Sequence, residues 1–95
     1  MIPGSTSKAS ESTVASAATI RAKSDILKVT GTTQVDTIIP AFEGFGGFLV
    51  LIPVDGSVVL STAGNILIGI TAVINRAVFM MYVKSTGKWY INSGV

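Results

Sequence analysis

Three short segments of this 95-residue chain are apolar on both of the faces that a β-strand would present. They are residues 45–52, 66–70 and 77–83, and their β-branched and aromatic residues favour strands over helices. A strand in a two-sheet sandwich buries one face and exposes the other, so apolar and polar residues should alternate along it. These segments therefore need a second surface to pack against, and another copy of the chain is the simplest one.

The remaining apolar segments alternate with polar residues, as half-buried strands do. Turn residues separate them, and in the turn at residues 53–56 we expect Gly56 to take the left-handed conformation. No apolar stripe at helical spacing stands out in the chain. The sequence predicts one all-β domain over residues 19–95, a small antiparallel sandwich or barrel of about seven to nine short strands. The other expected strands are residues 19–23, 26–29, 34–39, 57–61 and 88–91.

Two arrangements would accommodate the segments that have two apolar faces. In the first, copies of the chain pack together as an intimate homo-oligomer, because obligate interfaces resemble a domain core cut in half. In the second, a tightly rolled barrel bends its strands at bulges and breaks the alternation. In the first arrangement, we expect the oligomer interface to contain Phe48, Val50, Ile68, Phe79, Met81 and Val83.

The first 18 residues differ from the rest of the chain in composition. They are rich in Ser, Thr and Ala, and they have too few large apolar side chains to form a core element alone. One interpretation is a flexible tail. The other is an extended N-terminal arm, residues 1–18, that becomes ordered on a partner through Ile2, Pro3, Lys8 and Val14. No apolar run of signal-peptide length follows Lys8, so a secretory signal is not expected.

Composition argues against several classes of function. Charged residues make up 13% of the chain and its net charge is +2, which is too little for an electrostatic nucleic-acid binder. Because the chain has no Cys and no His, it lacks a thiolate nucleophile and the commonest general base and metal ligand. We therefore expect no enzymatic activity, no cofactor and no metal site. Residues 64–83 approach the length of a transmembrane helix, but Arg76, two asparagines and two glycines argue against one.

Three other features have a functional and a plain structural interpretation. Asp55 lies in a Pro-x-Asp-Gly sequence, which would suit a calcium ligand but is common as a simple turn. Trp89 and Tyr90 would suit stacking on a sugar or a base, but alternation alone would bury Trp89 and expose Tyr90. The glycines of residues 43–47 lack the following helix of a phosphate loop, and a bulge or a close backbone approach is expected there.

The order and spacing of several short motifs resemble a module of tailed-bacteriophage virion proteins, found in head decoration or cement proteins, head fibres and the ends of larger structural proteins. The resemblance covers about residues 18–90, and the chain departs from it at Val54 and at residues 84–86, where the family more often has an acidic turn. The motifs are Thr30-Gly31-Thr32-Thr33, a strand ending at Pro40, Phe45-Gly46-Gly47, Leu51-Ile52-Pro53-x-Asp55-Gly56, Thr62-Ala63-Gly64-Asn65-Ile66, a Met-rich strand ending at Tyr82, and Gly87-Lys88-Trp89-Tyr90.

This resemblance implies an all-β, homotrimeric protein on the surface of a phage particle and carries over no catalytic residues. The first hypothesis is a capsid decoration or cement protein that binds the major capsid protein after synthesis in the host cytoplasm. In it, the arm of residues 1–18 crosses the shell or a neighbouring trimer. The alternative is a fibre-tip or adhesin module that contacts host glycans through exposed aromatics such as Tyr90. Neither hypothesis involves nucleic acid or a membrane as partner.

Overall fold

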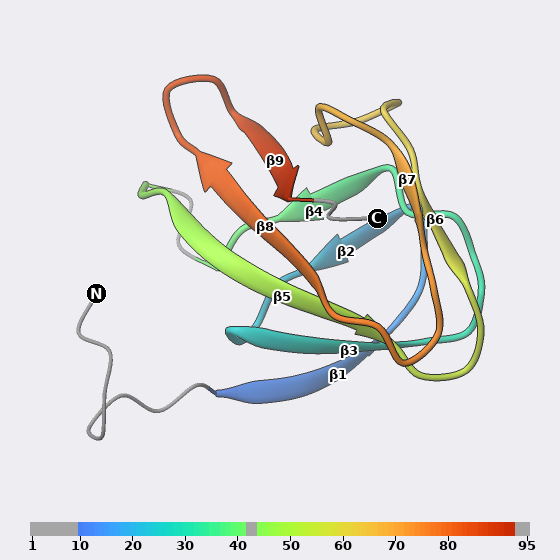
Figure 1. Cartoon of the computed structure of the whole chain (residues 1–95). Coiled ribbons are helices and arrows are strands. Elements are labelled where there is room, and N and C mark those ends of the chain that lie inside the picture. Colours follow the sequence, from blue (N-terminus) through green and yellow to red (C-terminus); the bar gives the residue numbers. More distant parts are fainter. Residues whose placement is uncertain (1–9, 42–43, 93–95) are drawn as a thin grey trace.

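The computed structural model describes residues 10–41 and 44–92, and in these two ranges the chain is all-β, without a helix (Figure 1). The predicted all-β class is therefore confirmed. The strands are β1 (Glu11–Ala15), β2 (Thr19–Arg21), β3 (Ile26–Thr30), β4 (Thr37–Ile39), β5 (Gly47–Pro53), β6 (Val58–Leu60), β7 (Ile70–Ala72), β8 (Val78–Val83) and β9 (Lys88–Asn92).

The strands form one large sheet and two small ones. The large sheet has five strands in the order β1-β3-β5-β8-β9, and the small sheets pair β2 with β4 and β6 with β7. The prediction of a purely antiparallel fold is wrong, because β1–β3, β3–β5 and β2–β4 are parallel pairs. From β1 to β5, strands of the five-stranded sheet alternate along the chain with strands of the β2–β4 sheet. Each strand of the β2–β4 sheet returns the chain to the starting end of the large sheet, so β1, β3 and β5 run in the same direction.

The hydrophobic core lies between the inner face of the five-stranded sheet and the two small sheets. Every second residue of β3, β5 and β8 points into it, and these side chains meet those of β2, β4, β6 and β7. The strands of the large sheet thus alternate between buried and more exposed positions. The largest side chains with almost no exposed surface are Trp89, Leu27, Ile38, Leu49, Leu51, Leu60 and Ile66.

The predicted strand at residues 66–70 is wrong over most of its length. β7 begins only at Ile70, and Ile66 instead makes an isolated parallel bridge with Trp89 at the outer edge of β9. Gly69 approaches β6 so closely that a Cβ atom there would lie 2.9 Å from the backbone oxygen of Leu60. The segment is apolar because Ile66 fills the core, while Ile68 remains 57% exposed.

The N-terminal segment contributes a strand that the sequence did not predict. β1 lies within the predicted arm of residues 1–18, pairs with β3 along its whole length and packs Val14 against the core. The sheet therefore begins at Glu11 and not at residue 19, because alternation along β1 turns Ser12 and Val14 inward and Val14 packs against the core. Ile2, Pro3 and Lys8, the other predicted contacts of the arm, lie outside the described residues.

Candidate functional site

The outer face of the five-stranded sheet, opposite the core, carries a cluster of large apolar side chains. On β5 they are Phe48 and Val50, and on β8 they are Phe79 and Met81. Phe48 pairs with Met81 and Val50 pairs with Phe79 in the antiparallel register. Directly opposed residues in such a pair have Cβ atoms about 4.5–5.5 Å apart, so these four side chains are neighbours. We call Phe48, Val50, Phe79 and Met81 the outer patch.

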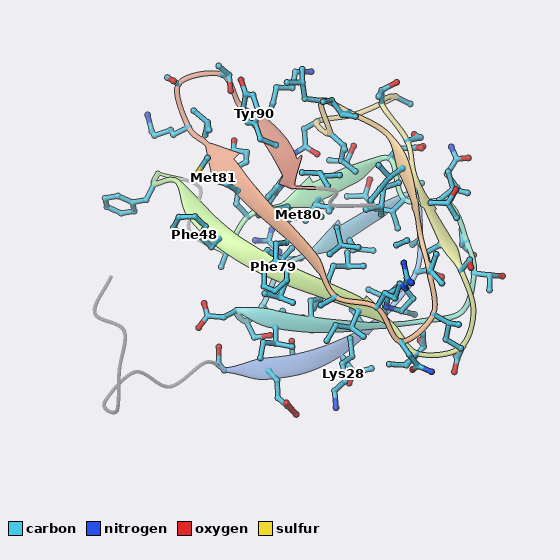
Figure 2. The ribbon with its side chains drawn as sticks, in the orientation of Figure 1. Lys28, Phe48, Phe79, Met80, Met81 and Tyr90 are labelled. Carbon is cyan, nitrogen blue, oxygen red and sulfur yellow. The ribbon has the colours of Figure 1, made fainter. Side chains whose placement is uncertain are left out.

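The outer patch is open to solvent in the single chain. Phe48 is 75% exposed and Phe79 is 56% exposed, whereas Met80 between the patch residues of β8 is 3% exposed and points into the core. Figure 2 shows this face, with Phe79 near its centre and Phe48 projecting from the start of β5. The patch lines a shallow hollow of about 480 Å³, and the neighbouring β9 adds Tyr90 to its wall. A contiguous exposed apolar surface of this kind marks an interaction site on most soluble proteins.

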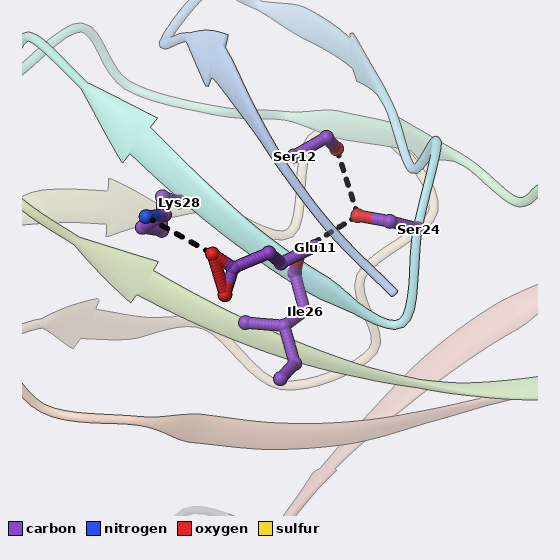
Figure 3. Close-up of polar contacts among 5 residues, drawn as sticks. All are labelled: Glu11, Ser12, Ser24, Ile26 and Lys28. Atoms are coloured by element: carbon purple, nitrogen blue, oxygen red, sulfur yellow. Dashed lines mark hydrogen bonds and ion pairs between the residues drawn. The ribbon is translucent and has the colours of Figure 1, made fainter. Parts of the chain in front are cut away.

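Polar side chains border the patch on the side of β1. Lys28 of β3 forms an ion pair with Glu11 of β1, with 3.4 Å between Nζ and Oε2; the Glu11 side chain is 60% exposed and that of Lys28 is 40% exposed (Figure 3). Between Glu11 and Val50 of the patch lies the half-buried Ile26, which pairs with both in the parallel registers. The face is thus apolar over β5 and β8 and charged at Glu11 of β1 and Lys28 of β3, which resembles the apolar centre and polar rim of protein–protein interfaces.

The structure brings together four of the six residues that the sequence assigned to an interface, namely those of the outer patch. Val83 continues their face at the end of β8, where it is half-buried and pairs with Lys88. Ile68 does not join them, because it lies in the segment before β7 and not on the five-stranded sheet. Sequence reasoning missed Ile26 as a neighbour of the patch, since the parallel β3–β5 pairing that places it there left no local signal.

The aromatic pair near the C-terminus divides between the two faces of the sheet, as simple alternation predicts. Trp89 is 2% exposed and packs in the core, with its ring 5.2 Å from that of Tyr82 between centroids. Tyr90 lies on the outer face beside Met81, its register partner, and its hydroxyl hydrogen-bonds Thr86 Oγ1 at 3.3 Å. The plain structural interpretation of Trp89 is therefore confirmed.

Two carboxylates, those of Asp36 and Asp55, accept hydrogen bonds in turns and loops. Asp55 Oδ2 accepts a hydrogen bond from the backbone N–H of Gly31 at 2.9 Å, which ties the turn after β5 to the turn after β3. Asp36 accepts hydrogen bonds from the Ser61 hydroxyl and from Gln34 Nε2, and these bonds lower the pKa of its carboxyl below the ordinary value of 3.8. In residues 10–41 and 44–92, no group of three or more acidic, His or Cys side chains is placed to hold a metal ion. Among the described residues, the exposed apolar surface of the outer patch is therefore the clearest candidate for a binding site.

No protein-family model, curated protein or solved structure matches this chain. Across the described ranges there is also no helix of the length and hydrophobicity needed to cross a membrane. The geometry of the outer patch and the sequence motifs are therefore the basis for a functional proposal.

Proposed function

We propose that this chain is a structural assembly protein: a homotrimer formed through the outer patch, which decorates and stabilises a tailed-phage head by binding the major capsid protein. The observation that supports self-association is the position of Phe79. It lies at the middle of a regular sheet, opposite Val50, and 56% of its surface is exposed. A residue of this size on a flat face is stabilised when a second apolar surface covers it.

The energy available from the patch is of the right size for an oligomer. Full burial of one Phe, Val or Met side chain is worth about 1.5–3 kcal/mol. Four such side chains in each copy would therefore contribute several kcal/mol per contact, which must exceed the cost of lost translational and side-chain freedom. The low charge of the chain, with charged residues at 13%, leaves little electrostatic repulsion between copies.

The virion part of the proposal rests on the motif resemblance over residues 18–90. In this proposal the N-terminal residues preceding β1, with Ile2, Pro3 and Lys8, contact the capsid, while β1 belongs to the body of the protein. A trimer presents three such segments together, so weak individual contacts add up through their high effective concentration.

The test of self-association compares two phenylalanines with similar exposure. Phe79→Glu should abolish the trimer in size-exclusion chromatography with light scattering while the chain stays folded, because it places a charge in the middle of the patch. Phe45→Glu is the matched control, since Phe45 is 72% exposed but lies before β5 and outside the patch. A wild-type chain that is monomeric at micromolar concentration would overturn the proposal.

The test of the virion role uses undecorated phage heads. The wild-type chain should bind purified heads at a saturating, high copy number, and the heads should withstand heating better afterwards. A fibre-tip or adhesin role predicts the opposite pattern, with few copies per particle and binding to cells or glycans instead of heads. Absence of binding to heads would remove the decoration role and leave self-association unaffected.

A further inference from the structure

Within residues 10–41 and 44–92, no backbone group bonds to the outer edge of the five-stranded sheet at β1. The backbone oxygen of Ser10 accepts from Ile26 N at 2.9 Å, and Ser16 N donates to the oxygen of Thr30 at 2.8 Å, so both bond to β3. In a strand, the backbone groups of successive residues point to opposite sides. Even-numbered residues of β1 therefore bond to β3, and odd-numbered residues direct their N–H and C=O groups away from the sheet. These residues are Glu11, Thr13 and Ala15, and all three are exposed.

The opposite edge of the same sheet is partly covered. Trp89 N in β9 donates to the backbone oxygen of Asn65 at 2.8 Å, and Leu67 N donates to the oxygen of Trp89 at 3.0 Å. The segment around Ile66 thus occupies the outer side of β9. β1 has no such cover from the part of the chain that the structure describes.

Apart from the single charge of Glu11, β1 also lacks the features by which most soluble proteins protect an exposed edge. It contains no proline and no lysine, and all five of its residues pair in register with β3, without a bulge. Two side-chain contacts attach it to neighbouring segments: the Ser12 hydroxyl lies 2.7 Å from that of Ser24, and Glu11 pairs with Lys28 (Figure 3). A regular, fixed edge of this kind is a template for one more strand.

We propose that β1 pairs antiparallel with β1 of a second copy, across a twofold axis at Thr13, and joins two five-stranded sheets into one. In this register Glu11 faces Ala15 of the second copy, so no like charges meet, and the two Thr13 side chains form a favourable cross-strand pair. Each odd-numbered residue of β1 then exchanges both of its free hydrogen bonds with its partner. A parallel pair in register would instead place Glu11 beside Glu11.

This contact is separate from the outer patch and goes beyond the proposed trimer. Glu11 and Thr13 share the outer face with Ile26 and Lys28, their register partners on β3. A twofold axis perpendicular to the sheet leaves that face on the same side in both copies. Two chains joined at β1 thus present both outer patches to one side. Edge pairing would therefore link one trimer to the next and extend a decoration layer laterally.

The test uses the absence of cysteine from the chain, which makes any introduced thiol unique. Thr13→Cys should be cross-linked to dimer by a short bismaleimide, because a hydrogen-bonded antiparallel pair has its Cα atoms about 5.5 Å apart. Ala15→Cys is the matched control, since its own partner position lies roughly 14 Å away, beyond the reach of the reagent. A mixture of Glu11→Cys and Ala15→Cys should again give cross-linked dimer.

The same experiment in the Phe79→Glu background separates the two contacts. We expect Thr13→Cys to give several-fold more dimer than Ala15→Cys with or without Phe79→Glu. Equal yields of cross-linked dimer from Thr13→Cys and Ala15→Cys would overturn the edge pairing, whether or not the copies also associate through the outer patch. Thr13→Pro in the otherwise unchanged chain gives an independent check: it removes only an outward N–H donor, so the chain should stay folded by circular dichroism and lose the edge contact. Unchanged assembly of the folded Thr13→Pro variant would also overturn the proposal.

Discussion

Trp89 donates its indole N–H to the backbone oxygen of Ile38 at 2.8 Å, and this bond joins the five-stranded sheet to the small sheet of β2 and β4. The same oxygen accepts a second bond, at 2.8 Å, from Nδ2 of Asn65, whose own Oδ1 accepts from Ile38 N at 2.9 Å. One backbone position of β4 is thus held by two side chains from distant parts of the sequence. The buried tryptophan has its polar atom satisfied, and the two layers are fixed relative to each other.

Asn65→Ala should therefore destabilise the fold. The change removes both bonds to Ile38, and it leaves the Ile38 N–H without a partner while Trp89 still satisfies the oxygen. Leaving a buried donor unpaired costs about 1–3 kcal/mol. Urea unfolding measures this loss, with Asn65→Asp as a control that keeps the acceptor for Ile38 N and loses the donor. A free energy of unfolding equal to wild type would contradict the role given to Asn65.

Gly64→Ala should destabilise the fold at a position where the backbones of two segments touch. A Cβ atom at Gly64 would overlap the backbone oxygen of Asp36 and the hydroxyl of Thr37. Overpacking of this kind typically costs about 1–3 kcal/mol. Gly47→Ala is the control, because nothing lies within 4 Å of the corresponding Cβ position. Thermal melting of the two variants should differ clearly, and equal melting temperatures would show that the loop at Gly64 moves aside.

The fold was predictable from the sequence where it depends on alternation along one strand. The two apolar faces of β5 and β8 are confirmed, and so are the expected strands at residues 77–83 and 88–91, which pair as β8 and β9 around a turn where Gly87 has a φ of +67°. The prediction of a left-handed conformation at Gly56 was wrong: among the described glycines, positive φ occurs instead at Gly31 and Gly87. Gly56 is constrained by space, since a Cβ atom there would lie 2.8 Å from Cγ2 of Thr32.

The sequence did not predict the contacts that depend on pairings between distant segments. The parallel β1–β3 and β3–β5 pairs place Glu11, Ile26 and Val50 in one row across the sheet. No local sequence pattern predicts such a row, because parallel partner strands are joined by long crossovers through another layer. The free edge at β1 was missed for the same reason. Its sequence has one large apolar side chain, Val14, and resembles a polar tail until β3 is placed beside it.

Stability should fall in acid partly through Asp36. The hydrogen bonds from Ser61 and Gln34 lower the pKa of the folded carboxyl below 3.8, so the folded state favours the ionised form. The stabilisation is fully present above 3.8 and is lost as the pH falls through the folded pKa. Urea unfolding at a series of pH values from neutral into the acid range should show a smaller loss of unfolding free energy for Asp36→Asn than for wild type. Ser61→Ala removes the hydrogen bond that lowers the Asp36 pKa most, so it should raise that pKa, measured by NMR titration. An unshifted pKa would contradict the role given to Ser61.

The Glu11–Lys28 ion pair should contribute little to stability. Its side chains are 60% and 40% exposed, and exposed pairs are typically worth less than about 1 kcal/mol. Lys28→Met should therefore leave the free energy of unfolding almost unchanged, while it extends the apolar surface of the outer patch toward β1. Self-association, measured by sedimentation, should become tighter and should depend less on salt. Weaker self-association of the folded variant would indicate that Lys28 makes a specific contact between copies.

Two N-terminal deletions should separate the body of the protein from the segment that precedes it. Removal of residues 1–9 leaves Ser10 and the whole of β1, with every hydrogen bond to β3 described above. The melting temperature should stay close to that of wild type, while binding to phage heads falls if these residues contact the shell.

Removal of residues 1–15 takes away an entire strand, exposes the edge of β3 and uncovers the core beside Val14. The second deletion should therefore lower the urea midpoint strongly and reduce the denaturant slope, because the slope scales with the surface exposed on unfolding. Equal stability of the two deletion variants would mean that β1 contributes nothing to the folded body.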